Sequence, residues 1–406
     1  MTVGKVPYHS CRKLKYVSLQ ELPAGRYWLY GSGNAAKTLL NQFTRMSHIS
    51  INGIVERHDL LQGRKIQELS GHSIKTLAEG SGAVILSAVN IHYQYNQLSA
   101  LENFTQYDEI YFIDPYASER VHRTPDAQTS ILLFENAIGV TGHHHWTKNL
   151  IRYLNERGAD VEIQSPLNLR AITERPVGQV ILWNGQSKLF TALRKCLADL
   201  QISPTYMEVG FFPQENFFYL DRSGVNQTSA LMQDPLDWIE ASHLDKIQRV
   251  RDTFLPGFVR TGKKYILVPL QVGTDTNVIN CSSFKNGMQD FIDFICAKYG
   301  ASAKLLFKEH PKDPARGTYN FYGHQFSDRP FTQLLENAAC VHGITSSTLY
   351  EAVLAGLEVI AEGESLLNRH AGKQQQLLAA MIDRQVSIEI RNFDYWINRY
   401  SHITLP

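Results

Sequence analysis

A chain of 406 residues is longer than one comfortable hydrophobic core requires, so two or three domains are expected. Its 40 Lys and Arg residues are balanced by 39 Asp and Glu residues, which argues against a nucleic-acid binder that depends on bulk charge. Five scattered cysteines suit a reducing cytoplasm and predict neither a disulfide framework nor a zinc ribbon, and no signal peptide or apolar run near ~18 residues predicts a membrane span.

The first sixteen residues are basic. They include Lys5, Arg12, Lys13 and Lys15 and no acidic residue. This composition predicts a solvated arm, with contact to an anionic membrane surface as the alternative.

Residues 20–125 have the pattern of a small Rossmann-type unit. A strand at Tyr27–Tyr30 enters the turn Gly31-Ser32-Gly33-Asn34, and a helix follows at Ala35–Phe43. Further strands are predicted at Ile49–Val55, Ala83–Ser87 and Glu109–Ile113. The turn departs from G-x-G-x-x-G because its third position is Ala36, although Glu56 ends the second strand where a ribose-binding acid could sit. We interpret the turn as structural, with a dinucleotide site as the alternative.

After a polar linker at residues 116–130 the α/β pattern restarts. A strand at Ile131–Phe134, a Gly/His loop at Gly139–His145 and a helix at Trp146–Arg157 lead to a strand at Ala159–Ile163, which is a βαβ unit. The next strand, Val180–Trp183, runs into Asn184. Three consecutive side chains cannot all face one ion, so His143, His144 and His145 are predicted to line a cleft and not to bind a metal.

The segment from Thr205 to Asp221 is rich in apolar and aromatic residues and contains Pro-Gln-Glu-Asn near its middle. One interpretation is a hairpin whose turn centres on residues 214–215, which places Glu208 opposite Asp221. Two carboxylates so close would have different pKa values, as acid/base or nucleophilic chemistry requires. The alternative is a strand followed by an extended loop.

The last part of the chain carries the strongest functional pattern. A polar helical stretch at Pro235–Phe254 precedes a third α/β region. Its strand at Tyr265–Pro269 is followed by Gln271, and its strand at Lys304–Lys308 is followed by His310 and Pro311. A later apolar strand leads into Ser346, Ser347 and Thr348 before a helix from Leu349 and a strand at Leu357–Ala361. Ligands bind beyond the carboxyl ends of such strands, and helix N-termini bind anions, so we expect a nucleotide phosphate here. An aromatic C-terminal helix is expected to fold back onto another domain.

This organisation suggests the α/β plan of two Rossmann-type domains called GT-B, with an additional N-terminal Rossmann-like unit. The predicted domains are residues 1–125, residues 126–260 on the acceptor side and residues 261–406 for the nucleotide with the helical tail. No Asp-x-Asp motif follows an early strand, so no metal is expected, and helix dipoles, His310 and hydroxyls would offset the charge of the leaving group.

Several segments between residues 180 and 365 resemble motifs of bacterial retaining β-Kdo transferases of O-antigen and capsule assembly. They are Trp183-Asn184-Gly185, Glu208 with Leu220-Asp221-Arg222-Ser223-Gly224-Val225-Asn226, Val268-Pro269-Leu270-Gln271-Val272, Lys308-Glu309-His310-Pro311-Lys312-Asp313 and Thr345-Ser346-Ser347-Thr348-Leu349-Tyr350-Glu351-Ala352. The usual Arg-Pro of the family stands here as Phe212-Pro213.

The resemblance implies transfer of Kdo from CMP-Kdo with retention through a covalent glycosyl-enzyme. It implies that Asp221 is the nucleophile and that Glu208 assists it. The CMP site would comprise His310, Pro311, Lys308, Ser346, Ser347, Thr348 and Gln271, and the acceptor side His143, His144, His145, Asn184 and Asn226. The implied acceptor is a lipid-linked glycan at the cytoplasmic membrane face, with possible peripheral contact to the membrane or to an assembly complex.

Two other interpretations remain open. The His-Pro and Ser/Thr motifs are shared with sialyltransferases and glycerophosphate transferases that use cytidine nucleotides. A non-catalytic protein that binds a nucleotide sugar or a glycan would also need the same phosphate site.

Overall fold

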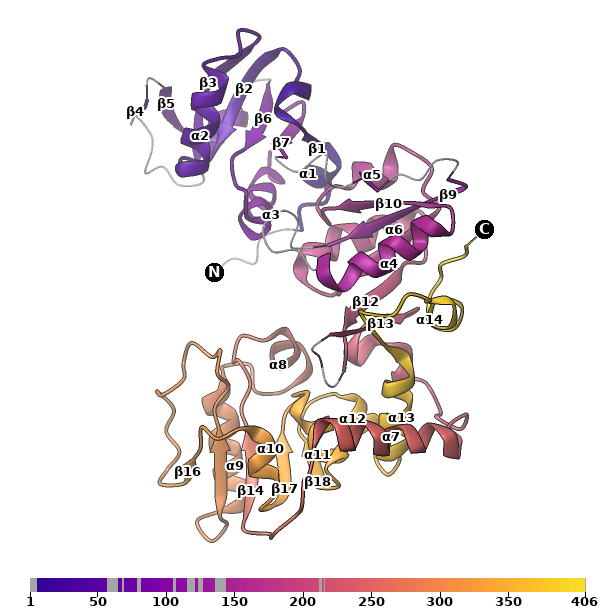
Figure 1. Ribbon diagram of the computed structural model, residues 1–406. Coiled ribbons are helices and arrows are strands. Elements are labelled where there is room, and N and C mark those ends of the chain that lie inside the picture. The colour runs from indigo at the N-terminus through magenta and orange to yellow at the C-terminus, as the bar shows by residue number, and fades with distance from the viewer. Residues whose placement is uncertain are drawn as a thin grey trace. The chain divides into compact units, whose positions relative to one another are not determined.

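The structure is a computed structural model of residues 1–406. It describes residues 6–56, 65–67, 69–78, 82–104, 107–114, 121–122, 127–135, 144–211, 214 and 216–405. The chain divides into two compact units (Figure 1). Unit 1 is Met1–Tyr206 with Arg391–Pro406, and unit 2 is Met207–Ile390. Residues 1–125 thus share unit 1 with part of the predicted second domain.

The N-terminal part of unit 1 is built on a seven-stranded sheet of order β1-β7-β6-β2-β3-β5-β4. Its strand pairs are parallel except for β4 with β5. The strands are β1 (Leu14–Val17), β2 (Gly25–Tyr30), β3 (Ile49–Glu56), β4 (Lys65–Ile66), β5 (Leu69–Ser73), β6 (Ala83–Leu86) and β7 (Ile110–Ile113). Helices α2 (Asn34–Phe43) and α3 (Ile91–Leu101) follow β2 and β6. The predicted strands of this region are therefore present.

The prediction of a solvated N-terminal arm was wrong for its described residues. Residues Tyr8–Lys13 form α1, and β1 pairs in parallel with β7. Cys11 and Leu14 have no exposed surface, because their apolar side chains enter the core while the Lys13 ammonium donates to the Tyr107 carbonyl at 2.9 Å. The basic residues of this segment flank apolar positions, and burial of those positions outweighs the tendency of the charges to keep the segment in water.

The second sheet contributes four strands to unit 1, in the order β11-β9-β10-β8. They are β8 (Val121–His122), β9 (Thr129–Phe134), β10 (Ala159–Gln164) and β11 (Gln179–Trp183), and only β8 is antiparallel to its neighbour. The helices here are α4 (His144–Glu156), α5 (Arg170–Thr173), α6 (Thr191–Asp199) and α14 (Asp394–Tyr400). The aromatic tail does return to unit 1, where the Phe393 ring packs edge-on against Tyr153 at 5.4 Å.

One hydrophobic core joins the two sheets of unit 1. Leu14 and Phe112 of the N-terminal sheet belong to the same buried cluster as Leu132 and Phe134 of β9. The Tyr8 hydroxyl also donates to the Asp199 carboxylate at 2.9 Å. The N-terminal Rossmann-like region is therefore packed onto the following α/β region and is not a separate domain joined to it by a linker.

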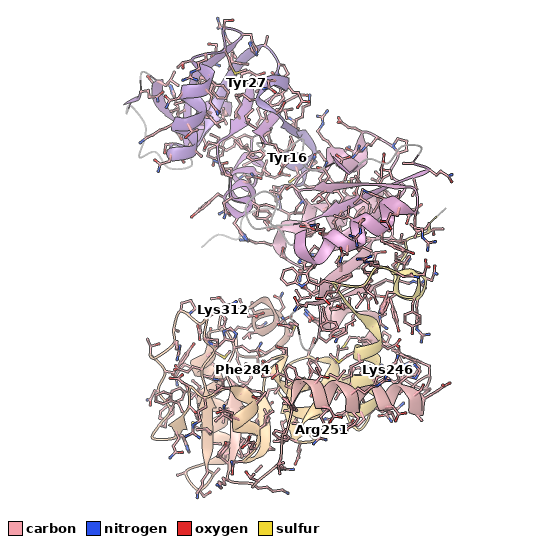
Figure 2. All side chains as sticks on the ribbon, in the orientation of Figure 1. Tyr16, Tyr27, Lys246, Arg251, Phe284 and Lys312 are labelled. Atoms are coloured by element: carbon pink, nitrogen blue, oxygen red, sulfur yellow. The ribbon has the colours of Figure 1, made fainter. Side chains whose placement is uncertain are left out.

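Unit 2 begins within β12 (Thr205–Val209) and contains its sheet neighbours β13 (Phe217–Asp221) and β19 (Gln385–Ser387). Strands β13 and β19 are antiparallel. Helix α7 (Ala241–Phe254) packs along α13 (Gln374–Arg384) in the same unit, where Figure 2 shows Lys246 and Arg251 on α7.

The rest of unit 2 is a five-stranded parallel sheet of order β16-β15-β14-β17-β18. The strands are β14 (Tyr265–Pro269), β15 (Leu305–Lys308), β16 (Gln325–Phe326), β17 (Ala338–Gly343) and β18 (Glu358–Ala361). The helices are α8 (Thr276–Cys281), α9 (Met288–Tyr299), α10 (Phe331–Leu335), α11 (Thr348–Leu354) and α12 (Leu366–Arg369). A core that includes Val268, Phe291 and Phe307 fixes the central strands, and hence the loops at their carboxyl ends.

Among the described residues, no helix combines the length and the apolar character that crossing a bilayer requires.

Candidate functional site

The carboxyl ends of three adjacent parallel strands carry the predicted phosphate motif. Strands β15, β14 and β17 are neighbours in the sheet. His310 lies two residues beyond β15, Gln271 two residues beyond β14, and Thr345 two residues beyond β17. Parallel strands end at one edge of a sheet, so the three loops lie at the same edge, with the β14 loop between the other two.

Gln271 ties two of these strand ends to each other. Its side-chain oxygen accepts from the Thr345 backbone N–H at 2.9 Å, and its amide nitrogen donates to the Thr345 hydroxyl at 3.3 Å. Gln271 is buried, at 7% exposure. Its role in this structure is therefore to hold the loop that leads to α11, which positions the hydroxyl cluster.

His310 presents one ring nitrogen to the site. Its Nδ1 accepts from the Lys312 backbone N–H at 3.2 Å, so the neutral ring carries its proton on Nε2, which can donate. Burial lowers the pKa of His310, and the Asp313 and Asp275 carboxylates act in the opposite direction. The imidazole is therefore neutral near pH 7 and can donate a hydrogen bond from Nε2. Burial also lowers the pKa of Lys308, while Pro311 is exposed at the turn that follows.

The hydroxyl cluster stands at the start of α11. The Ser346 hydroxyl lies 2.8 Å from the Thr348 hydroxyl and accepts from the Thr348 backbone N–H at 3.3 Å. Ser347, the N-cap residue, makes no capping bond with its side chain. All three side chains are partly exposed. The Ser346 hydroxyl thus has the ordinary capping role, and the hydroxyls of Ser347 and Thr348 remain accessible for a ligand.

Two acidic residues that the sequence analysis did not single out belong to the same region. Asp275, in the loop after β14, caps α8 through its bond from the Asn277 N–H at 2.8 Å, is partly exposed, and acts electrostatically on His310. Glu351 lies in the first turn of α11, and burial raises its pKa to about 7. Asp275 stands four residues after Gln271, a spacing that could have marked it, because loops after parallel strands carry ligand-binding residues.

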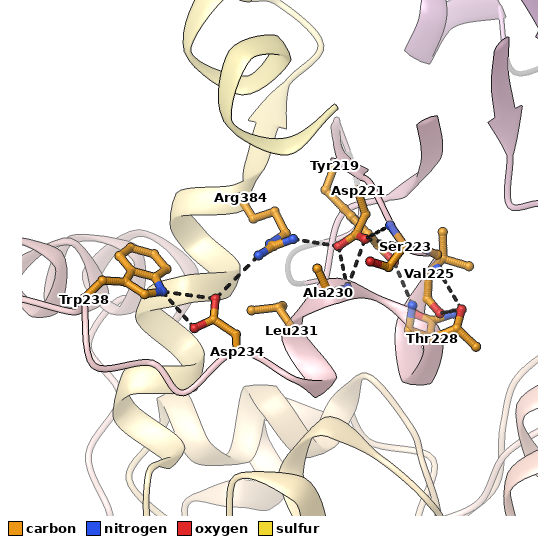
Figure 3. Close-up of polar contacts among 12 residues, drawn as sticks. Tyr219, Asp221, Ser223, Val225, Thr228, Ala230, Leu231, Asp234, Trp238 and Arg384 are labelled. Atoms are coloured by element: carbon orange, nitrogen blue, oxygen red, sulfur yellow. Dashed lines mark hydrogen bonds and ion pairs between the residues drawn. The ribbon is translucent and has the colours of Figure 1, made fainter. Parts of the chain in front are cut away.

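Asp221, the predicted nucleophile, is the centre of a buried polar network (Figure 3). Its carboxylate accepts from the backbone N–H groups of Ser223 at 2.7 Å, Gly224 at 3.2 Å and Ala230 at 3.0 Å. The Arg384 guanidinium on α13 binds it at 2.6 Å. Asp221 has no exposed surface and Arg384 only 4%, so this carboxylate is enclosed and its acceptor positions are occupied by protein groups.

The network extends beyond this pair. Arg384 also lies 3.8 Å from Asp234, and the Trp238 indole N–H donates to Asp234 at 3.0 Å (Figure 3). His370 bonds the Leu231 carbonyl at 2.7 Å. The predicted motif after β13 therefore folds into a loop that contacts from α12 and α13 hold in place. In this structure Asp221 positions that loop.

The predicted hairpin forms, with a register that differs from the expected one. The Gly210 N–H donates to the Phe217 carbonyl at 2.8 Å, which brings Glu208 opposite Tyr219 and not opposite Asp221. The centre of the pairing thus lies one residue earlier than expected, and sequence symmetry does not specify this position. Burial, and after it the Glu208 carboxylate, raises the pKa of Tyr219. Glu208 is partly exposed and accepts from the Val209 N–H at 2.9 Å.

The structure describes only part of the predicted acceptor side. His143 and Phe212-Pro213 lie outside the described residues, and so do the side chains of His144 and His145. Asn184 follows β11 and Asn226 follows β13, each with a positive φ. Asn184 accepts from the Gln186 N–H at 3.0 Å, and the Asn226 N–H donates to the Tyr219 hydroxyl at 3.0 Å. Asn184 shapes the turn at the end of β11, and Asn226 begins a short 3-10 helix in the loop after β13.

The N-terminal glycine turn is occupied by protein groups. The Glu56 carboxylate accepts from both the backbone N–H and the hydroxyl of Ser32 at 2.8 Å. At Gly31, with φ +110°, a Cβ would stand 2.3 Å from the Ser87 hydroxyl oxygen. The acid that could have bound a ribose instead binds the turn, which supports the structural interpretation.

Within the described part of the chain, no group of three or more His, Cys, Asp or Glu residues is arranged to hold a metal ion.

Comparison with known proteins finds a family match over one part of the chain. Residues 257–387 match the family described as capsule polysaccharide biosynthesis protein. FixF of Sinorhizobium fredii (strain NBRC 101917 / NGR234) is 26% identical over 203 residues, which are 47% of this chain and 49% of that protein. The chain thus matches about half the length of this curated relative.

Two solved structures are also similar. The β-Kdo 2,7 transferase of Thermosulfurimonas dismutans KpsC is 17% identical, with a TM-score of 0.47, over 64% of this chain and 92% of that one. The β-Kdo 2,4 transferase of the same protein is 16% identical, with a TM-score of 0.43, over 59% of this chain and 81% of that one.

Proposed function

We propose that this chain is a retaining glycosyltransferase. The premise is the match of residues 257–387 to the capsule polysaccharide biosynthesis family. It would transfer Kdo from CMP-Kdo to a glycan of an O-antigen or a capsule. The observation that carries the proposal is the convergence of His310, Gln271 and the Ser346–Thr348 cluster at the ends of β15, β14 and β17. Neutral and positive donors at one sheet edge suit a leaving nucleotide monophosphate.

The donor phosphate would be held by protein groups. The His310 Nε2–H, the hydroxyls of Ser347 and Thr348 and the N–H groups at the start of α11 supply hydrogen bonds, and Lys308 supplies charge. Each of these stabilises the negative charge that accumulates on CMP as the glycosidic bond breaks.

We favour Asp275 over Asp221 as the nucleophile because of its exposure and its electrostatic effect on His310. Asp275 is partly exposed and its charge acts on His310, the residue assigned to the phosphate. A carboxylate oxygen of Asp275 would attack the anomeric carbon of Kdo, and the bond from that carbon to the phosphate oxygen would break as CMP leaves. Asp221 has every acceptor position engaged inside unit 2, so attack through it would require loss of the bond to Arg384.

The second displacement regenerates the enzyme. An acceptor hydroxyl would give its proton to Glu208 and attack the same carbon, and the Asp275 carboxylate would leave. Two inversions at one carbon give net retention. The acceptor is proposed to be the non-reducing end of a lipid-linked glycan at the cytoplasmic membrane face.

A donor screen tests the function. The full chain is incubated with CMP-Kdo, CMP-sialic acid and CDP-glycerol, and the release of CMP is measured for each. Release from CMP-Kdo alone supports the proposal, release from another donor replaces Kdo with that group, and release from none favours a binding protein.

Intact-mass measurement after a single turnover without acceptor then tests the mechanism. A mass gain equal to one Kdo residue, mapped to Asp275, supports double displacement. A Kdo adduct on Asp221 would restore the assignment that the sequence motifs implied.

A further inference from the structure

Unit 1 contains two neighbouring cavities that the transferase chemistry does not use. Their volumes are about 640 Å³ and about 710 Å³, and they are neighbours because Glu21 and Asp114 line both. Each has the volume of a pocket that encloses a drug-sized molecule, so together they can hold a chain of several rings. We refer to the two cavities together as the unit 1 groove.

The first half of the groove lies between the carboxyl ends of β1 and β10. Its wall includes Tyr16 (labelled in Figure 2), Gln164 and Asn168. The Asn168 amide nitrogen donates to the Gln164 side-chain oxygen at 2.7 Å, and the Gln164 amide in turn donates to Glu162. Gln164 and Asn168 are each 8% exposed, so their amides are fixed before any ligand arrives. Fixed amides at a groove wall are suited to hydrogen bonding with sugar hydroxyls.

The second half lies between residues 18–21 and one face of α2. Thr38 and Leu39 of α2 form one wall, and Leu86 and Phe112 at the ends of β6 and β7 also line the cavity. The Thr38 hydroxyl bonds the Asn34 carbonyl at 3.1 Å in its own helix. Apolar surface edged by hydroxyls and carboxylates matches the C–H faces and O–H edges of a saccharide.

The charges of the groove disfavour an anionic ligand. The first half carries Lys15, Arg170 and Arg175 against the carboxylates of Glu21, Asp114, Glu162 and Glu174. Each of the three cations is already paired, Lys15 with Glu109, Arg170 with Glu174, and Arg175 with Glu162. The second half is lined by Glu21 and Asp114 and by no basic residue. A phosphate or a nucleotide sugar would find no uncompensated positive charge here, whereas a neutral polyhydroxyl chain meets no electrostatic penalty.

We infer that the unit 1 groove binds a neutral segment of the acceptor glycan. This inference rests on the proposed function, because it takes a glycan as the substrate. It assigns to the N-terminal region the recognition of chain length.

Binding without donor tests the groove separately from transfer. The full chain is titrated by calorimetry with di-, tetra- and octasaccharides cut from the source strain's own neutral polysaccharide, with CMP absent. We expect the affinity to rise at least tenfold from the disaccharide to the octasaccharide.

Thr38→Trp would fill the α2 side of the groove. It should lower the octasaccharide affinity about tenfold and leave disaccharide binding unchanged. Lys37→Trp, on the neighbouring exposed position of α2 outside the groove, is the matched control and should bind as wild type does. Asn168→Ala probes the other half and should have the same effect as Thr38→Trp, with thermal melts to confirm folding.

The outcomes separate the two proposals. Affinity that does not rise with length, or an octasaccharide affinity that Thr38→Trp and Asn168→Ala leave intact, overturns the groove assignment. So does a loss of CMP-Kdo affinity in Thr38→Trp, which would make the groove a nucleotide site. Groove-dependent octasaccharide binding by a protein that releases no CMP from any donor supports the groove and contradicts the transferase.

Discussion

Two aspartates of unit 2 illustrate how burial separates residues of the same type. Asp221 is enclosed by three backbone N–H groups and Arg384, whereas Asp275 is partly exposed beside the His310 site. A carboxylate that must attack a sugar needs accessible lone pairs, and one that holds a loop needs them occupied.

Paired substitutions distinguish these roles. Asp275→Asn should abolish Kdo transfer and the covalent adduct while CMP affinity and thermal stability stay near wild type. Asp221→Asn should leave the buried Arg384 with only Asp234, 3.8 Å away, as a counter-charge, at a cost of up to about 3–5 kcal/mol in the free energy of unfolding. Thermal melts and intact mass check both, and an unaltered melt for Asp221→Asn together with loss of the adduct would return the nucleophile role to Asp221.

His310 should contribute to donor affinity as a hydrogen-bond donor to an anionic oxygen. His310→Ala is expected to weaken CMP binding by about 1.5–3 kcal/mol, the usual value of a bond to a charged group. Calorimetry with CMP measures this, with Lys312→Ala as the control because the exposed side chain of Lys312 can be removed without loss of its backbone N–H to His310. Equal affinity for wild type and His310→Ala would remove His310 from the phosphate site.

The motif residues were predictable at this scale because short motifs report local chemistry. His310, Ser346 and Thr348 stand where the strand pattern placed them. The burial of Asp221 was not predictable, because Arg384 is 163 residues away and no local pattern links the two. Glu351 shows the same limit, since its pKa near 7 arises from burial by the tertiary fold.

At the scale of elements, strand ends are the most informative features of this chain. Strand β14 matches its prediction, and β15 and β18 were expected to within one residue, because buried parallel strands are continuous apolar runs. The hairpin register and the N-terminal helix were not predicted. The hairpin register depends on where a long loop closes. The N-terminal helix depends on the apolar surface of a distant part of the chain.

Strand β9 ends at a buried carboxyl group that should affect stability. Glu135 has no exposed surface, and neither of its oxygens has a described hydrogen-bond partner in ordinary geometry. Burial raises its pKa from the ordinary 4.5 to about 7, although the Thr147 hydroxyl acts in the opposite direction. The folded state therefore keeps the proton that the unfolded state loses, and stability falls as pH rises from about 4.5 to about 7.

Glu135→Gln should remove this dependence. Two to three pKa units correspond to about 3 kcal/mol, so the variant should gain stability relative to wild type at pH 8 and little at pH 5. Urea denaturation at both pH values measures the difference. Glu156→Gln, on exposed α4 with 64% of its side chain accessible, is the control and should show no such change. If Glu135→Gln changes the free energy of unfolding by the same amount at both pH values, the raised pKa is contradicted.

For the whole molecule, the sequence predicted successive α/β regions, and the structure has them. The expected boundary at residue 126 falls inside unit 1, because one hydrophobic core spans both of its sheets. Sequence composition marks a polar segment, but it does not report whether the flanking regions share a core.

Chelation tests the reaction as a whole. If protein donors alone neutralise the departing CMP, EDTA should leave the rate of Kdo transfer within about twofold of the untreated enzyme, since hydrogen bonds and helix dipoles are not removed by chelators. CMP release is followed before and after treatment, with added Mg²⁺ as the control. A rate that collapses with EDTA and recovers with Mg²⁺ would show that the reaction depends on a divalent cation.

The polypeptide leaves unit 1 at residue 206 and re-enters it at residue 391. In sequence, unit 2 therefore interrupts unit 1, so neither a C-terminal nor an N-terminal cut can isolate unit 1 intact. A fragment that stops at residue 206 would lack the α14 segment and leave the Tyr153 side of α4 without its Phe393 partner. Only a fusion of residue 206 to residue 391 through a short linker would preserve all the segments of unit 1.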